Sequence, residues 1–229
     1  MNNKNKTLLL APDKINNGHM SMGIHIEGKS GTGKSYVTKK LLIEPIIQKN
    51  EGLIYYCGKR DYYTASEIRD ICIKYSREDD FSIINLSKPS NIDNIDKIDF
   101  KNVIAQKSII VILAPALQYS SEDNIIREKI LFDTIKEAVI DLFTGTPNKS
   151  LSSYSIIIDE PNIKSFKSIY DLKTVCRSIN PNISLTTISQ DSITEENCKH
   201  KQYFVNLGAY LNTDLNIAYI SGEKPQIIS

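Results

Sequence analysis

An apolar segment followed directly by a glycine-rich loop constrains the fold of this chain more than any other feature. The segment is GIHIE at 23–27, and the loop reads Gly28-Lys29-Ser30-Gly31-Thr32-Gly33-Lys34-Ser35, which fits G-x-x-x-x-G-K-[ST]. Its glycines let the backbone wrap around a phosphate with successive N–H groups pointing inward. A helix that starts at the lysine adds a favourable dipole for the anion. The pattern therefore predicts a phosphate-binding loop between a buried strand and a helix.

Each part of this loop has an expected role. Lys34 is expected to reach the β- and γ-phosphates of a nucleoside triphosphate, and Ser35 to ligate Mg²⁺. The backbone of 28–35 is expected to supply the remaining phosphate contacts. Lys29 is interpreted as a variable loop position rather than as a lysine that acts across a dimer. A chance glycine-rich turn is the alternative, and the flanking strand and helix argue against it.

Short apolar runs alternate with longer amphipathic ones, which is typical of an α/β domain with a mainly parallel sheet flanked by helices. Isoleucine, valine and tyrosine dominate the apolar runs, as a buried sheet prefers. We predict a single domain over 1–229, with 1–20 as a flexible or peripheral N-terminal segment. The predicted strands are 23–27, 52–57, 81–86, 108–114, 154–159, 183–189, 203–208 and 216–221.

Helices are predicted after the first, second, fourth and fifth of these strands, over 34–49, 64–75, 122–143 and 165–179. Thr64 or Ser66 is the predicted N-cap of the second helix. Two polar, turn-rich segments, 87–102 and 145–153, are predicted to be loops.

Composition excludes several classes of protein. The formal net charge is +1, without the basic excess of a protein that coats nucleic acid, so any DNA contact would come from a local patch or an assembled ring. No window approaches the ~20 apolar residues of a spanning helix, so we expect no membrane span and a cytoplasmic location. The scattered cysteines lack a CxxC pair and are predicted to be reduced thiols. They are Cys57, Cys72, Cys176 and Cys198.

A second half of the nucleotide site is predicted where the apolar run YSIIID ends in Asp159 and Glu160. Asp159 is expected to hold the Mg²⁺ shell, mostly through water. Glu160 is placed to polarise the attacking water as a general base. The alternative is an exposed turn before Pro161, which the apolar run leading into the acidic pair disfavours.

Two further side chains are candidates for the same site. The strand 183–189 leads into Gln190, which is expected to touch the γ-phosphate or the lytic water, or else to be a solvated strand end. Arg177 ends the helix 165–179 and is a candidate arginine finger, a cation that stabilises the transferring phosphoryl group, often from a neighbouring subunit. Arg60 is the second candidate. A surface salt bridge is the alternative for both arginines, and for Arg60 it is favoured.

Together these motifs resemble the FtsK–HerA superfamily of ring-forming, RecA-like P-loop ATPases. The phosphate loop, the Asp-Glu pair, the arginine-bearing helix and the strand ending in glutamine occur in the same order. Three segments are more narrowly similar to TraD- and DotL-like type IV coupling proteins: GLIYYCGKRD (52–61), YSREDDFSIINL (75–86) and SIIVILAPALQYS (108–120). Within these segments, the resemblance to coupling proteins depends most on two short sequences, Arg77-Glu78-Asp79-Asp80 and Ala114-Pro115-Ala116-Leu117.

The resemblance implies a RecA-like domain that uses ATP and Mg²⁺ and assembles into a homo-oligomeric ring, with a hexamer favoured. It implies a DNA or nucleoprotein substrate and a membrane-anchored secretion or conjugation partner, which would place the chain at the inner membrane peripherally. The membrane helices, inserted helical domain and C-terminal tail of coupling proteins have no counterpart here, so we expect a motor core only.

Three functions are compatible with these observations. The first is a motor ATPase that drives DNA or protein–DNA transfer in conjugation or secretion. The second is a genome-packaging ATPase of a virus or mobile element, from the same superfamily. The third is a nucleotide-gated scaffold with little turnover. In a motor, the basic contacts to DNA are expected from Lys164, Lys167 and 198–202, which otherwise form a solvated face.

Overall fold

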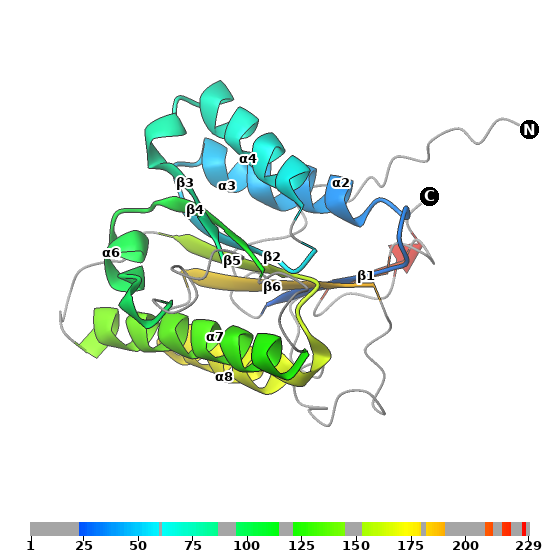
Figure 1. Cartoon of the computed structure of the whole chain (residues 1–229). Coiled ribbons are helices and arrows are strands. Elements are labelled where there is room, and N and C mark those ends of the chain that lie inside the picture. Colours follow the sequence, from blue (N-terminus) through cyan, green and yellow to red (C-terminus); the bar gives the residue numbers. More distant parts are fainter. Residues whose placement is uncertain are drawn as a thin grey trace, which may run out of the picture.

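Six short strands form the larger part of a central sheet in the computed structural model (Figure 1). The structure describes residues 23–59, 61–86, 95–114, 121–144, 153–179, 182–190, 209–212, 217–220 and 226–227. Most of these strands are buried along their whole length, which explains their isoleucine-rich composition. Their bounds are β1 Ile24–Glu27, β2 Gly52–Cys57, β3 Phe81–Asn85, β4 Ile109–Leu113, β5 Tyr154–Asp159 and β6 Ile183–Ser189.

The strand order of the sheet is β3-β4-β2-β5-β6-β1-β7-β8-β9. The neighbours from β3 to β7 (Ala209–Asn212) pair in parallel, whereas β8 (Ile217–Ile220) and β9 (Gln226–Ile227) are antiparallel additions. The predicted α/β fold with a mainly parallel sheet is confirmed. The register pairs Cys57 with Asp159 and Glu27 with Ser189, so the ends of four strands meet at one carboxyl edge.

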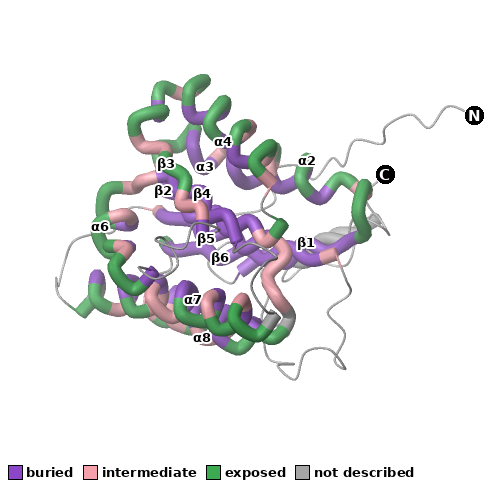
Figure 2. Tube along the Cα trace, viewed as in Figure 1, coloured by how far each residue is buried: buried purple, intermediate pink, exposed green. Residues whose placement is uncertain are grey.

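Helices cover both faces of this sheet (Figure 1). The alternation of side chains along β2 shows why, because Tyr55 joins the core beneath one set of helices and Tyr56 the core beneath the other. Figure 2 shows the buried strands between helices whose outer sides are exposed. One face carries α2 Lys34–Thr38, η2 Lys39–Ile43, α3 Glu44–Gln48 and α4 Tyr62–Lys74, and the other carries α6 Phe100–Ala105, α7 Ser121–Thr144 and α8 Phe166–Ile179.

The helix predicted over 34–49 is confirmed, but its middle, η2, is a π-helical turn. Pro45 lies two residues after the end of η2 and has no N–H with which to continue the regular bonding pattern to residue 41. A π turn ahead of it changes the hydrogen-bond register and lets the helix continue through the proline. The helix that begins at the phosphate-binding loop therefore consists of α2, η2 and α3 in sequence.

Two predictions of local structure are wrong. The N-cap of α4 is Asp61, which accepts from the Tyr63 N–H at 2.9 Å, so Thr64 and Ser66 lie inside the helix. The segment 87–102 is not all loop, because α6 begins at Phe100. Asp99 caps that helix by accepting from the Asn102 N–H at 3.0 Å. A short helix with one cap and two buried apolar anchors gives too weak a periodic signal to recognise in sequence.

The other boundaries follow the sequence closely. The strands 52–57, 154–159 and 183–189 and the helices 122–143 and 165–179 are confirmed to within one residue. Segments 1–20, 145–152 and 203–208 lie outside the described residues, and the strands β7 and β9 were not predicted from the sequence. Cys57, Cys72 and Cys176 are free and buried, and Cys198 lies outside the described part. None of the described helices combines the length and the apolar character that crossing a membrane requires.

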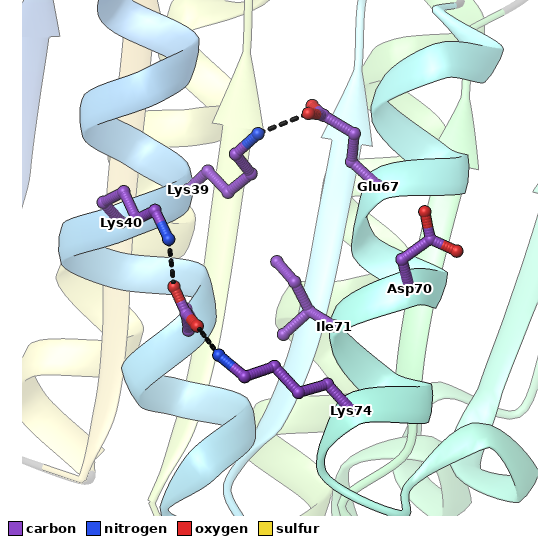
Figure 3. Close-up of a pocket in the computed structure, with 7 residues that line it drawn as sticks. Lys39, Lys40, Glu67, Asp70, Ile71 and Lys74 are labelled. Carbon is purple, nitrogen blue, oxygen red and sulfur yellow. Dashed lines mark hydrogen bonds and ion pairs between the residues drawn. The ribbon is translucent and has the colours of Figure 1, made fainter.

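A charged groove of about 280 Å³ lies between the loop-bearing helix and α4 (Figure 3). Glu44 accepts from Lys40 at 2.9 Å and from Lys74 at 2.6 Å, and Lys39 pairs with Glu67. The Lys74 hydrogen bond, followed by that of Lys40, lowers the pKa of Glu44 to about 2. The Lys39–Glu67 and Lys74–Glu44 pairs join α4 to the helix that carries the phosphate-binding loop, whereas the Lys40–Glu44 pair lies within that helix.

Candidate nucleotide-binding site

The phosphate-binding loop adopts a conformation that its glycines permit. Gly31 and Gly33 have φ of 81° and 97°, in the left-handed region that side chains with a Cβ rarely enter. Gly33 directly precedes the helix, whose first turn is closed by the Val37 N–H donating to the Gly33 carbonyl at 2.9 Å. The loop thus delivers the chain into a helix N-terminus, where unpaired N–H groups attract anions.

Lys34 lies over this loop with its side chain largely buried. Its Nζ donates to the carbonyl oxygens of Gly28 and, at 2.8 Å, of Lys29. The Thr32 hydroxyl donates to the same Lys29 carbonyl at 2.8 Å and closes the turn. The ammonium group is therefore held at the mouth of the loop, where phosphate oxygens are better acceptors than the carbonyls it now contacts.

Asp159 ends β5 and is mostly buried. The Tyr55 hydroxyl, reaching across from β2, donates to its Oδ2 at 2.7 Å. Burial is the largest cause of a pKa raised to about 6, and the Glu160 charge raises it further. The Tyr55 hydrogen bond, Lys59 and Lys34 act in the opposite direction. A divalent cation beside this carboxylate would compensate the burial of its charge.

Glu160 follows β5 in a left-handed conformation with φ of 51°, which is uncommon for a residue with a side chain and is often found at functional sites. Its N–H donates to the Ile188 carbonyl at 2.9 Å, which fixes the backbone against β6. Gln190 Nε2 donates to its Oε2 at 3.2 Å, and Lys59 Nζ lies 2.5 Å from its Oε1. The two strand ends predicted to cooperate are thus brought together, with Lys59 as an additional member.

Gly58 explains how the ends of β2 and β5 approach so closely. Its N–H donates to the Asp159 carbonyl at 2.8 Å. A Cβ at this position would lie 2.0 Å from the Glu160 carbonyl oxygen, so no larger residue fits without displacement. Sequence reasoning missed Gly58 and Lys59 as site residues. The available signal was the sequence CGKRD directly after a buried strand, at the same edge as Asp159.

One pocket of about 290 Å³ joins these parts. Ser35 and Asp159 supply a hydroxyl and a carboxylate, the hard oxygen donors that suit Mg²⁺ when water and phosphate oxygens complete its shell. In the described part of the chain no group of three or more His, Cys, Asp and Glu side chains is arranged to hold a metal on its own. The pocket is lined by Ser30, Gly31, Gly33, Lys34, Ser35, Tyr36, Lys59, Asp159 and Glu160.

Other predicted residues lie away from this pocket. Arg177 is exposed in the last turn of α8. Because α8 connects the parallel strands β5 and β6, it returns from the carboxyl edge to the amino edge, which removes Arg177 from the pocket of its own chain. Lys164 is exposed in the short 3₁₀ turn Ile163–Ser165, and Lys167 is exposed in the first turn of α8 that follows it. Arg60 and 198–202 lie outside the described residues.

Comparisons with protein-family models and with curated proteins give no match. Among solved structures, the chain is similar to the DNA-packaging ATPase B204 from Sulfolobus turreted icosahedral virus, with 15% identity, a TM-score of 0.48, and coverage of 85% of this chain and 76% of that one. The chain is also similar to the genome packaging NTPase B204 from Sulfolobus turreted icosahedral virus 2 in complex with ATP-gammaS. The identity is 12%, the TM-score is 0.43, and the match covers 83% of this chain and 73% of that one. A third similar structure is chloroplast FtsY from Physcomitrella patens, with 8% identity, a TM-score of 0.30, and coverage of 67% of this chain and 46% of that one.

None of these three structures is a type IV coupling protein. Because their TM-scores all lie below 0.5, these likenesses assign no function to the chain. The function has to be inferred from the geometry of the pocket.

Proposed function

We propose that this chain binds ATP with Mg²⁺ and hydrolyses it. The observation that carries the proposal is a single pocket lined both by the phosphate-binding loop, with Lys34 and Ser35, and by the acidic end of β5, with Asp159 and Glu160. These residues are more than a hundred positions apart in the chain, and the sheet register brings them to the same edge. Binding and activating groups in one pocket are the minimum that phosphoryl transfer to water requires.

The residues divide the work of hydrolysis between them. The loop N–H groups and Lys34 would hold the phosphates and neutralise their charge, and Ser35 and Asp159 would hold Mg²⁺ beside them. Glu160 would accept a proton from the attacking water. The water oxygen then bonds to the γ-phosphorus, and the bond from that phosphorus to the β–γ bridging oxygen breaks. ADP and inorganic phosphate leave, and the proton passes from Glu160 to solvent.

Glu160 suits the role of base better than Asp159 does. Asp159 is more deeply buried, and the Tyr55 hydroxyl occupies one of its oxygens. Glu160 is only partly buried and lines the pocket one residue further from the sheet. Gln190 contacts its carboxylate, so it is placed to orient either the base or the water.

The energy released would serve the movement of DNA through a homo-oligomeric ring. We place genome packaging in a virus or mobile element first, and DNA or nucleoprotein transfer through a membrane-anchored conjugation or secretion partner second. The segment that favoured coupling proteins, 77–80, has a structural explanation. Arg77 is buried and donates to the backbone carbonyls of Glu51 and, at 2.7 Å, Lys107, while pairing with Asp80 at 2.8 Å. Its sequence thus reflects packing at the amino edge and does not specify a cargo.

Turnover of ATP by the purified chain, with and without double- and single-stranded DNA, tests the proposal. Glu160→Gln should retain ATP binding and lose about 10²–10⁴-fold in turnover. Glu137→Gln, an exposed glutamate on α7, is the matched control and should behave as wild type. Equal turnover in Glu160→Gln and wild type would contradict the assignment. DNA-stimulated turnover supports the motor, whereas ATP binding with little turnover, whatever DNA is added, would support a nucleotide-gated scaffold instead.

A further inference from the structure

Two side chains hold the Glu160 carboxylate from opposite neighbouring strands. Lys59, just beyond the end of β2, lies 2.5 Å from Oε1, and Gln190, just beyond the end of β6, donates to Oε2 at 3.2 Å. The Glu160 side chain is 17% exposed, whereas that of Lys59 is 42% exposed. Both oxygens of the proposed base are therefore engaged while one of its partners remains half in solvent.

This pairing is unsuitable for catalysis. A general base must offer a carboxylate oxygen to the attacking water within hydrogen-bond reach. The Lys59 ammonium group lies against Oε1 and occupies the side of that oxygen to which a water would have to bind. For Glu160 to accept a proton, the contact with Lys59 has to be relinquished, so the structure shows the base in a restrained state.

Lys59 has an alternative partner within the same pocket. It lines the space together with Lys34 and the loop, where a triphosphate would sit. A lysine side chain is a compact charge on a flexible four-carbon stem, so it can exchange partners without movement of the backbone. A terminal phosphate carries more negative charge than a carboxylate and offers more acceptor oxygens.

The backbone beneath Lys59 is fixed, which confines any exchange to its side chain. Gly58 hydrogen-bonds to the Asp159 carbonyl at 2.8 Å and packs against the Glu160 carbonyl with no room for a Cβ. The ends of β2 and β5 therefore keep their relative positions whatever Lys59 contacts.

We propose that Lys59 senses the γ-phosphate, pairing with Glu160 until ATP binds and then moving to the terminal phosphate and releasing the base. The inference rests on the proposed function, since it assumes that the pocket takes ATP. Lys59 would act as a positioning residue for Glu160 and a specificity residue for ATP over ADP. Hydrolysis would remove the phosphate and return Lys59 to Glu160, which restrains the base until the next ATP arrives.

The test measures dissociation constants of the full chain with Mg²⁺ for ADP and for AMPPNP, an ATP analogue with a non-hydrolysable terminal linkage. Lys59→Met should weaken AMPPNP binding about tenfold, the effect of losing one charge-assisted hydrogen bond, and leave ADP binding nearly unchanged. Lys59→Arg should restore most of the difference. Lys74→Met is the matched control, because Lys74 also pairs with a glutamate but lies in the groove of Figure 3.

A double-mutant cycle adds a readout that simple loss of structure would not give. Glu160→Gln should tighten AMPPNP binding several-fold by releasing Lys59, and should have no such effect in the Lys59→Met background. If Lys59→Met weakens both nucleotides equally, or weakens neither, the inference is overturned while ATP binding stands. If the wild-type chain binds neither nucleotide, the proposed function fails and the inference fails with it.

Discussion

Among single residues, Asp159 shows most clearly that a group placed for Mg²⁺ binding can lower the stability of the folded chain. Its carboxyl group is buried at the end of β5, and that burial raises its pKa to about 6. A raised pKa means that the folded chain binds the proton more tightly than the unfolded chain does. The ionised form needed for Mg²⁺ is therefore a cost to the folded state above that pH.

Asp159→Asn should remove this cost. In Mg²⁺-free buffer near pH 7.5, the variant should be more stable than wild type by about 3 kcal/mol. The difference should shrink as the pH falls from about 6 and disappear below the ordinary pKa of 3.8, where Asp159 is protonated in both states. Urea unfolding at several pH values measures it, and Mg²⁺-dependent nucleotide binding should be lost in parallel. A gap that is independent of pH would contradict the assigned pKa.

Gly58→Ala should separate the ends of β2 and β5, because the new Cβ would lie 2.0 Å from the Glu160 carbonyl oxygen. We expect a loss of about 1–3 kcal/mol in stability and at least a tenfold loss in turnover by the folded fraction. Gly52→Ala is the matched control at the other end of β2, where a Cβ would meet the Tyr154 ring at 2.1 Å. It should destabilise similarly without affecting turnover of folded protein. Equal losses of turnover in both variants would show that Gly58 has no special relation to the site.

The single residues that sequence reasoning selected are those with a local motif. Lys34 and Ser35 belong to a contiguous pattern, and Asp159 and Glu160 follow an unbroken apolar run, so their proximity could be expected from parallel strand ends. Gly58 and Lys59 depend on the pairing of β2 with β5, about a hundred residues later. The local sequence CGKRD marks them as following a buried strand, but it does not encode which strand pairs with β2, so their contact with the end of β5 became evident only from the sheet.

At the scale of elements, α7 supports the loop that follows the proposed base. Glu128 of α7 is buried, and its carboxylate accepts from the Tyr56 hydroxyl at 2.6 Å, the Asn162 N–H at 3.0 Å and the Ser165 hydroxyl at 2.7 Å. Burial nevertheless raises its pKa, against the effect of these three donors. One carboxylate thus links a helix, a strand and the turn after Glu160.

Glu128→Gln should loosen that turn. The amide retains one acceptor oxygen and directs an NH₂ group at donors, so at least one donor loses its partner at a cost of about 1–3 kcal/mol. We expect lower turnover with little change in ATP affinity, because the phosphate-binding loop is not contacted. Stability, the dissociation constant and turnover are measured on the same preparation, beside Glu137→Gln. A weakened ATP affinity with unchanged turnover would contradict the proposed support of Glu160.

Elements were predictable where one strong signal covers the whole segment. The strands β2, β5 and β6 are continuous buried runs, and α7 repeats its apolar positions over many turns. The element α6 was missed because its anchors, Phe100 and Ile104, span a single turn. The π turn in the loop-bearing helix has no periodic signature, although Pro45 inside a helical pattern is the residue that marked it.

At the scale of the whole molecule, the strand order decides which predicted residues can meet in one chain. Because β6 lies between β5 and β1, Gln190 at the end of β6 contacts Glu160 at the end of β5, and its strand also pairs with the strand that leads into the phosphate-binding loop. The same connection sends α8 away from the pocket, and Arg177 is reached about 17 Å along the helix from Phe166. Sequence order alone made both residues candidates, and only the topology separates them. An arginine finger at Arg177 therefore requires a second subunit.

Two variants that are each inactive should recover activity when they are mixed. Arg177→Ala keeps Glu160 but lacks the finger, and Glu160→Gln keeps the finger but lacks the base. If Arg177 acts across a subunit boundary, mixed assemblies contain interfaces with an intact pair, and turnover should rise well above that of either variant alone, most at equal ratios. The finger itself is expected to contribute about 10³–10⁵ in turnover. Full activity of Arg177→Ala by itself would exclude the finger, and two inactive variants that never complement would place the defect of Arg177→Ala within its own subunit.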